Sequence, residues 1–167
     1  VAQMPLVRAV ALRPTNMRRI PVMKVLIVEP MKKPYAKDIK PGLKPLQHEV
    51  GGYIQAIYPF EEQVGLICNE EGKVDGLPLN RAVYGQNGEM VDVIAGTFLI
   101  VGLGEEDFES LADDLADKFS KLYESPEEFY SLGGEIFVEK VEPLPDEPTH
   151  ADHKAPKKQA RKSEPVR

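Results

Sequence analysis

The chain has 167 residues, one cysteine and a net charge of −6 that is unevenly divided along its length. Residues 1–22 hold four arginines and no acid, residues 23–142 hold 11 basic against 23 acidic residues, and residues 143–167 hold six basic against four acidic residues. The single cysteine excludes an intramolecular disulfide, and the longest strongly apolar stretch, residues 91–101, is too short to span a membrane. We therefore expect one folded domain, residues 23–142, in a cytoplasmic protein without a membrane contact.

The two basic ends are expected to lie outside this domain. Pro5, Pro14 and Pro21 interrupt residues 1–22, which also lack the continuous apolar region of a signal peptide. We interpret this segment as disordered or as a wrongly assigned extension, with Met23 as the true start. Residues 143–167 have almost no bulky apolar side chain and are predicted to form a disordered basic tail.

The first half of the domain has a regular pattern. Residues 24–28 form an apolar and β-branched run that predicts a strand, and residues 31–44 carry five lysines against one acid. We expect this segment to be a basic loop. Its Lys33 and Tyr35 are candidate contacts for an anion or a partner, unless the lysines are simply solvated. Pro45 then begins a short helix that ends at Gly51-Gly52.

Strands and turns are expected to follow this helix. Residues 53–58 and 63–68 are strand-like, and Gly72 in the turn at residues 69–73 is predicted to have a positive φ. Residues 77–81 contain a proline and are expected at a sheet edge or in an ordered loop. After a turn at residues 85–88, the apolar run at residues 91–101 predicts one strand near the centre of the sheet.

The last part of the domain contains the clearest helical pattern. An apolar stripe with spacings of three and four predicts a helix that Ser110 and Asp113 cap; its residues are Phe108, Leu111, Leu115, Phe119 and Leu122. Residues 125–128 resemble the start of a second short helix, which Gly133-Gly134 would end before a strand at residues 135–141. The whole pattern predicts an α+β domain with a mostly antiparallel sheet of about five or six strands and two or three helices packed on one side.

Catalytic and cofactor motifs are weak. Residues 101–104 contain two glycines where a dinucleotide fingerprint would lie, but the third glycine is missing and three carboxylates follow. His48 and Cys68 could form a nucleophilic pair, although a surface histidine and a core thiol explain them more simply. His150 and His153 have too few neighbouring ligands for a metal site. We expect no catalytic residue, cofactor or metal, and an enzyme is the less favoured interpretation.

The acidic surface and one polar pair are the remaining candidate contacts. Residues 102–142 hold 13 acids against three bases, which is typical either of a face that mimics nucleic-acid phosphates or of a solvated helix face. The candidate carboxylates are those of Glu105, Glu106, Asp113, Asp114 and Asp117. Asn80 and Arg81, beside the Gly51-Gly52 segment, are the polar groups of an alternative small-ligand site.

Several motifs resemble an uncharacterised bacterial domain family. They include Asn69-Glu70-Glu71-Gly72-Lys73 and Gly76-Leu77-Pro78-Leu79-Asn80-Arg81. The other matching segments are residues 23–35, 42–43, 46–47, 50–54, 57–60 and 94–97. The resemblance covers about residues 23–107 and begins at Met23, so we expect the helical region after Asp107 to be a local extension. Such domains are frequent on gut mobile elements and phages, and the resemblance implies no established activity.

These observations lead to one expected function and two alternatives. We expect a non-enzymatic binding or regulatory protein of a bacterial mobile element or phage, whose partner is a host protein. One form of this function is an acidic inhibitor of a host defence protein or a nucleic-acid-binding protein. The acidic body argues against direct binding to nucleic acid. A small-ligand-binding domain and a hydrolase of unknown substrate are the alternatives.

Overall fold

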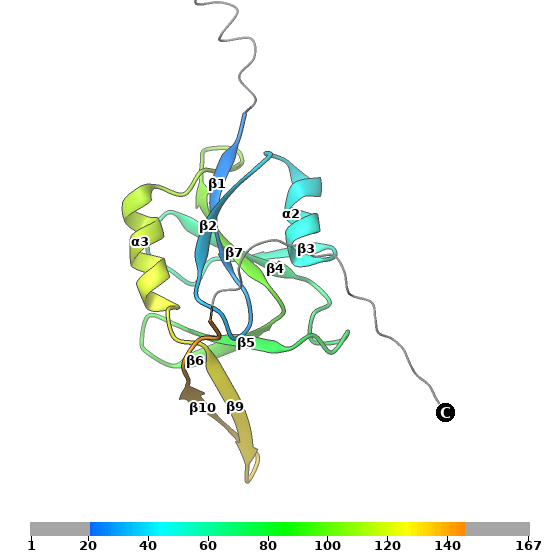
Figure 1. Ribbon diagram of the computed structural model, residues 1–167, viewed down its shortest axis with the longest axis vertical. Coiled ribbons are helices and arrows are strands. Elements are labelled where there is room, and N and C mark those ends of the chain that lie inside the picture. Colours follow the sequence, from blue (N-terminus) through cyan, green and yellow to red (C-terminus); the bar gives the residue numbers. More distant parts are fainter. Residues whose placement is uncertain (1–20, 146–167) are drawn as a thin grey trace, which may run out of the picture.

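The computed structural model describes residues 21–145, which form an α+β fold around an antiparallel sheet (Figure 1). Five strands of this six-stranded sheet lie in the order β2-β1-β7-β4-β3, and β8 pairs with β7. The strands of the sheet are β1 (Met23–Val28), β2 (Tyr35–Ile39), β3 (Ile54–Ile57), β4 (Val64–Asn69), β7 (Phe98–Leu103) and β8 (Phe108–Glu109). The predictions for the two basic ends concern mainly residues 1–20 and 146–167, which lie outside the described residues, as do His150 and His153.

The central strands are buried on both faces. Alternate residues of β1 belong to two separate apolar clusters, as the two-residue period of a strand requires: Leu26 and Val28 lie in one, Val25 and Ile27 in the other. The first cluster is covered by α3 (Asp113–Leu122) through Phe119, and the second by α2 (Leu43–Val50). The two helices therefore cover opposite faces of the sheet, not the one side that the sequence predicted (Figure 1).

The predicted single strand at residues 91–101 is wrong. It is two strands, β6 (Met90–Ala95) and β7, separated by Gly96, which has a φ of +87°. β6 pairs with β5 (Leu79–Tyr84) in a separate hairpin, whereas β7 lies at the centre of the main sheet. The backbone angle favours glycine there, because side chains on L residues rarely adopt it. A β-carbon on Gly96 would also lie 2.7 Å from the Leu77 Cδ1 atom, so the end of that side chain would have to move.

The helix predicted from the apolar stripe at residues 108–122 is shorter than expected. Phe108 and Glu109 form β8, and the helix begins only at Asp113. Ser110 does not cap it, because its hydroxyl oxygen accepts a hydrogen bond from the Lys24 backbone N–H at 3.0 Å. Leu115 and Phe119 of the stripe still face the core, where Phe119 packs edge-on against Phe60 with ring centroids 4.7 Å apart, whereas Leu122 is 50% exposed.

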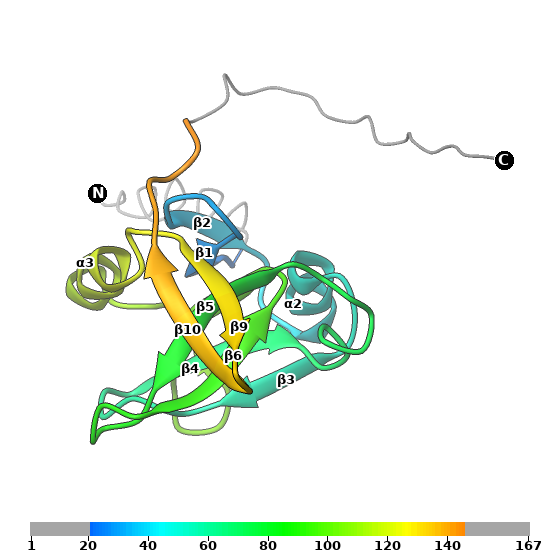
Figure 2. The same ribbon diagram turned by 90° about the horizontal axis from the view of Figure 1, so that it is seen from below.

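The predicted second short helix is a β-hairpin. β9 (Glu127–Leu132) pairs antiparallel with β10 (Glu135–Lys140). Gly133 and Gly134, with φ values of 60° and 85°, form the two-residue turn between them, and the type I′ form of such a turn requires a positive φ at both positions. The hairpin extends beyond the main sheet in Figure 1, and Figure 2 shows it lying over the β5–β6 hairpin.

Two other glycines differ in their roles. Gly51 ends α2 with a φ of +81°, which confirms the predicted C-cap. Gly72 is not among the glycines with positive φ, so that prediction is wrong. Its small size matters instead, because an added β-carbon would lie 2.6 Å from the Ala95 carbonyl oxygen.

Among the residues that the structure describes, no helix has both the length and the apolar character needed to cross a bilayer.

Candidate interaction surfaces

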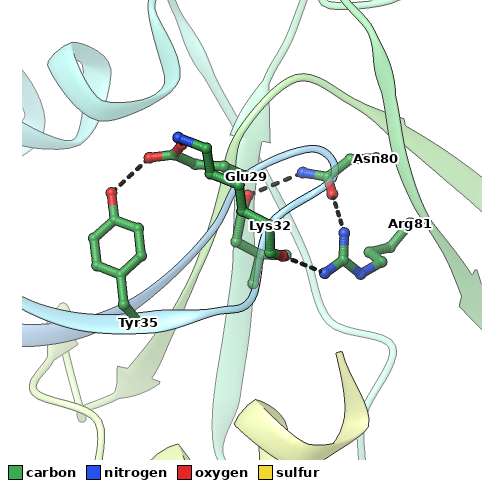
Figure 3. A network of polar contacts seen from close by, with 6 residues as sticks. Glu29, Lys32, Tyr35, Asn80 and Arg81 are labelled. Carbon is green, nitrogen blue, oxygen red and sulfur yellow. Dashed lines mark hydrogen bonds and ion pairs between the residues drawn. The ribbon is translucent and has the colours of Figure 1, made fainter. Parts of the chain in front are cut away.

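The conspicuous polar pair of the sequence, Asn80 and Arg81, is fully buried on β5 (Figure 3). The Asn80 Nδ2 atom donates to the Val28 carbonyl at 2.9 Å and to the Gly96 carbonyl at 2.8 Å. The Asn80 Oδ1 atom accepts from the Arg81 Nη1 atom at 2.9 Å. Asn80 thus joins the end of β1 to the corner between β6 and β7.

Arg81 extends the same network to two other segments. Its Nε and Nη2 atoms donate to the Tyr123 carbonyl at 3.2 and 2.6 Å, and Nη2 also donates to the Lys32 carbonyl at 2.8 Å. Burial lowers the pKa of the guanidinium, and the nearby Glu127 carboxylate opposes this shift. Because all these acceptors belong to the protein, we assign Asn80 and Arg81 a structural role rather than the predicted contact with a small ligand.

The predicted basic loop is partly a strand, and two of its lysines form ion pairs. Lys37 lies 2.8 Å from Glu49, and Lys32 lies 3.5 Å from Glu29. Tyr35, the first residue of β2, donates its hydroxyl to the Glu29 Oε2 atom at 2.6 Å, and burial raises the pKa of this phenol (Figure 3). Lys33 is exposed in the connection before β2. The structure therefore places Lys33 and Tyr35 on the surface at one edge of the main sheet.

The five candidate carboxylates are all exposed. Glu105 and Glu106 lie between β7 and β8, and the three aspartates lie in the first half of α3. Asp113 forms an ion pair of 2.7 Å with Lys24, which lowers the pKa of the aspartate. The other four carboxylates form no ion pair with another described residue: Glu105, Glu106, Asp114 and Asp117.

The structure does not bring His48 and Cys68 together. His48 is exposed on α2, which covers one face of the sheet, whereas Cys68 is buried in the apolar cluster on the opposite face. Burial raises the pKa of the Cys68 thiol to about 11, so the thiol is protonated at neutral pH. Within residues 21–145, no group of three or more histidine, cysteine or acidic side chains is arranged to hold a metal ion.

An apolar groove lies between the two hairpins, and the sequence did not reveal it. It has a volume of about 470 Å³. Strands β5 and β6 supply one wall and the β9–β10 hairpin supplies the other. Lys73 and Asp92, which form an ion pair of 2.5 Å, are its charged lining residues. The other lining residues are Leu79, Met90, Val91, Val93, Phe129, Tyr130, Ser131 and Ile136.

Several groove residues are exposed although they lie on strands. Val91 is 59% exposed and Ile136 is 55% exposed. Sequence reasoning missed this surface because it assigned Val91 to a buried central strand and residues 125–128 to a helix. The first two residues of β6 are exposed and its last three are buried, a change that is understood only when Gly96 is recognised as the end of that strand.

Comparison with known proteins places the domain in a family. Residues 23–124 match the family DUF3846, described as a domain of unknown function. The match begins at Met23, as the resemblance predicted, but it continues past Asp107 through α3, so the expectation that α3 is a local extension is wrong. The β9–β10 hairpin lies beyond the matched residues. No curated protein and no solved structure matches the chain. Since the match spans more than half of its residues, the chain belongs to the DUF3846 family.

Proposed function

We propose that this protein is a non-enzymatic binding or regulatory protein of a bacterial mobile element or phage, which acts on a host protein in the cytoplasm. The groove between the β5–β6 and β9–β10 hairpins is the observation that supports a binding function best. Its lining is almost entirely apolar, with one ion pair among the lining residues. The frequent occurrence of the resembling domains on mobile elements supports the choice of a host protein as the partner.

The exposure of the groove residues gives the physical reason. Burying apolar surface stabilises a protein by about 25 cal/mol per Å², so apolar side chains that remain in water lose a favourable contribution. Contiguous apolar surface on a soluble protein commonly marks a site that a partner covers. The groove meets this description because Val91 and Ile136, from different hairpins, are both more than half exposed.

The experiment is affinity capture from the native host with matched variants. Val91→Asp and Ile136→Asp place a charge in the groove, and Leu43→Asp places the same charge on α2, where Leu43 is as exposed as Ile136, at 55%. We expect one captured protein to be lost with both groove variants and retained with Leu43→Asp, while circular dichroism stays unchanged. Equal capture by all three variants would contradict a docking role for the groove.

A second candidate function is favoured by the exposed carboxylates. An acidic inhibitor of a nucleic-acid-binding protein would present charges that imitate phosphates. Glu105, Glu106, Asp114 and Asp117 meet this requirement because they are exposed and form no ion pair within residues 21–145. Neutralising these four residues to Gln and Asn should weaken binding of the captured protein and reduce its dependence on salt. Unchanged affinity would dispose of this candidate.

A further inference from the structure

The β9–β10 hairpin is attached firmly at its base but packs little along its outer face. The buried Glu127 carboxylate accepts the Ala82 backbone N–H at 2.8 Å, and the Val141 N–H donates to the Pro126 carbonyl at 2.8 Å. The first contact fixes the base of the hairpin to β5, and the second joins the two ends of the hairpin to each other. A two-stranded hairpin alone is marginally stable in water, so such anchoring keeps it folded.

The strand register defines the composition of the outer face. Tyr130 lies opposite Phe137, Leu132 opposite Glu135, and Glu128 opposite Glu139. Directly opposed residues share a face, and alternate pairs along a hairpin lie on the same side, so these six side chains form one surface, which we call the outer face. The pair Phe129 and Val138 lies on the other side and is partly buried.

The outer face is exposed and apolar at its centre. Tyr130 is 46% exposed, Phe137 is 47% exposed and Leu132 is 67% exposed. None of the three is among the side chains of the two apolar clusters of the core. The two aromatic residues lie opposite each other across the strands and present a platform to solvent. Tyr130 also lines the groove, whereas Phe137 does not.

The same face carries three carboxylates without a basic partner in the described part of the chain. Glu128 and Glu139 are directly opposed, and like charges in this arrangement destabilise a hairpin. The Tyr130 hydroxyl donates to the Glu128 Oε1 atom at 2.9 Å, and mainly this bond raises the pKa of the phenol to about 12. No lysine or arginine of residues 21–145 forms an ion pair with Glu128, Glu135 or Glu139. A bound cation would relieve this repulsion.

We propose that the outer face of the β9–β10 hairpin docks a protein segment in which arginine or lysine residues flank an apolar side chain. The apolar side chain would cover Leu132 and the aromatic platform, and the basic groups would pair with the three carboxylates. An arginine stacked on Tyr130 or Phe137 would add a cation–π contact. The acidic rim disfavours a nucleic acid, and it also disfavours a second copy of this face, which carries the same charge.

This inference rests on the proposed function, because it assumes a protein partner, and it adds the chemistry of that partner. It also concerns residues outside the family match at residues 23–124. The docking surface therefore belongs to the part of this chain that lies beyond the family domain, whereas β5 and β6 of the groove lie within it.

The test uses the full chain, labelled with ¹⁵N, and two synthetic peptides. One is the basic peptide Arg-Leu-Arg-Leu-Arg with blocked ends, and the other is its acidic counterpart Glu-Leu-Glu-Leu-Glu. We expect the basic peptide to shift the amide signals of residues 127–140 and the acidic peptide to leave them unchanged. Shifts centred on α3 would overturn the proposal, as would shifts of the hairpin signals that depend on protein concentration without peptide, since these would indicate a second copy.

Two matched double variants distinguish binding to the carboxylates of the hairpin from binding to the exposed carboxylates between β7 and β8. Glu128→Gln with Glu139→Gln removes two opposed charges from the outer face, and Glu105→Gln with Glu106→Gln removes two exposed charges elsewhere. The first pair should weaken peptide binding at least about twofold, as expected for two exposed ion pairs, and the second pair should not. The first pair relieves a like-charge repulsion, so unfolding of the hairpin is not expected. A smaller decrease, or an equal decrease for both pairs, would overturn the proposal.

The aromatic platform and the groove are tested separately. Phe137→Ala should also weaken binding of the basic peptide, and the retained amide signals of β9 and β10 would show that the hairpin remains folded. Val91→Asp lies on β6 and should leave peptide binding intact. Loss of the captured host protein is the readout for the groove, so the failure of either proposal can be recognised without the other.

Discussion

Replacing Asn80 by alanine tests whether the buried polar network holds the fold together. The side chain is fully buried and makes three hydrogen bonds of 2.8 to 2.9 Å, to the carbonyls of Val28 and Gly96 and to the Arg81 guanidinium. Alanine removes all three and leaves two buried carbonyl oxygens and one charged donor with fewer partners. It also leaves a small cavity where the amide was.

The magnitude follows from these three contacts. A hydrogen bond contributes about 1 kcal/mol net, and an unsatisfied buried group costs about 1 to 3 kcal/mol, so Asn80→Ala should destabilise the protein by about 3 to 5 kcal/mol. With a urea dependence of about 2 kcal/mol per M, the unfolding midpoint should fall by roughly 2 M. Circular dichroism at increasing urea concentrations measures this shift.

Asn87→Ala is the matched control. Asn87 is exposed in the turn between β5 and β6, and its Oδ1 atom accepts a single hydrogen bond of 3.1 Å from the Glu89 N–H. Its loss should cost no more than about 1 kcal/mol. Equal effects of the two substitutions would refute the reasoning, because burial and the number of partners would then have no influence.

Three further predictions concern buried groups. Arg81→Met removes every hydrogen bond to the Tyr123 and Lys32 carbonyls and should lower stability by at least about 3 kcal/mol in the same urea assay. Gly72→Ala forces a β-carbon to within 2.6 Å of a backbone carbonyl oxygen and should cost about 2 kcal/mol. Cys68, with a pKa of about 11 against an ordinary value of 9.0, should react with iodoacetamide at pH 8 about a hundredfold more slowly in the folded protein than in urea.

The raised pKa of Cys68 also has a defined effect on stability. Between about pH 9 and 11 the folded protein keeps the thiol proton that the unfolded chain loses, so the contribution of this group to stability falls as the pH rises. Cys68→Ser should remove this part of the pH dependence. A thiol that reacts equally fast in folded and unfolded protein would contradict the burial.

Elements with a local signal could be predicted from the sequence. The spacing of Leu46 and Val50 and the glycine that follows them indicated α2, and both leucine and valine are buried there. The turn at residues 69–73 does follow β4, but β4 pairs with β3 and β7 and not with the strand after the turn. For α2 the periodicity of apolar side chains and the backbone preference of glycine are sufficient.

Elements decided by distant contacts could not be predicted. Gly96 within an apolar run is compatible with a continuous strand, and the corner is evident only from its φ of +87° in the folded protein and its packing against Leu77. Residues 125–128 have a suitable cap, proline and acids for a helix. The Glu127 carboxylate instead accepts a hydrogen bond from the backbone N–H of Ala82, 45 residues away in the sequence. The groove depends on both errors, because its two walls are the hairpins that the sequence did not predict.

The candidate contact residues could likewise be placed from the sequence only in part. The sequence located exposed charged residues such as Glu105 and Asp114 correctly on the surface. It could not show that Asn80 and Arg81 point inward, because their acceptors come from β1, the β1–β2 connection, the β6–β7 corner and the end of α3. A polar residue in a segment that contains proline is usually exposed, and here backbone carbonyls from distant segments replace water.

The pairing of β1 with β7 has a consequence for synthesis on the ribosome. Val28 of β1 lies opposite Phe98 of β7, so the first strand of the sheet must wait for residues about 70 positions later in the chain. At ordinary translation rates of about 5 to 20 residues per second, this interval lasts roughly 4 to 14 s. During that time the apolar residues of β1, which are fully buried in the finished protein, have only β2 as a neighbour in the sheet. Until β7 has emerged, a nascent chain of this protein would therefore expose a short apolar segment of the kind that chaperones bind.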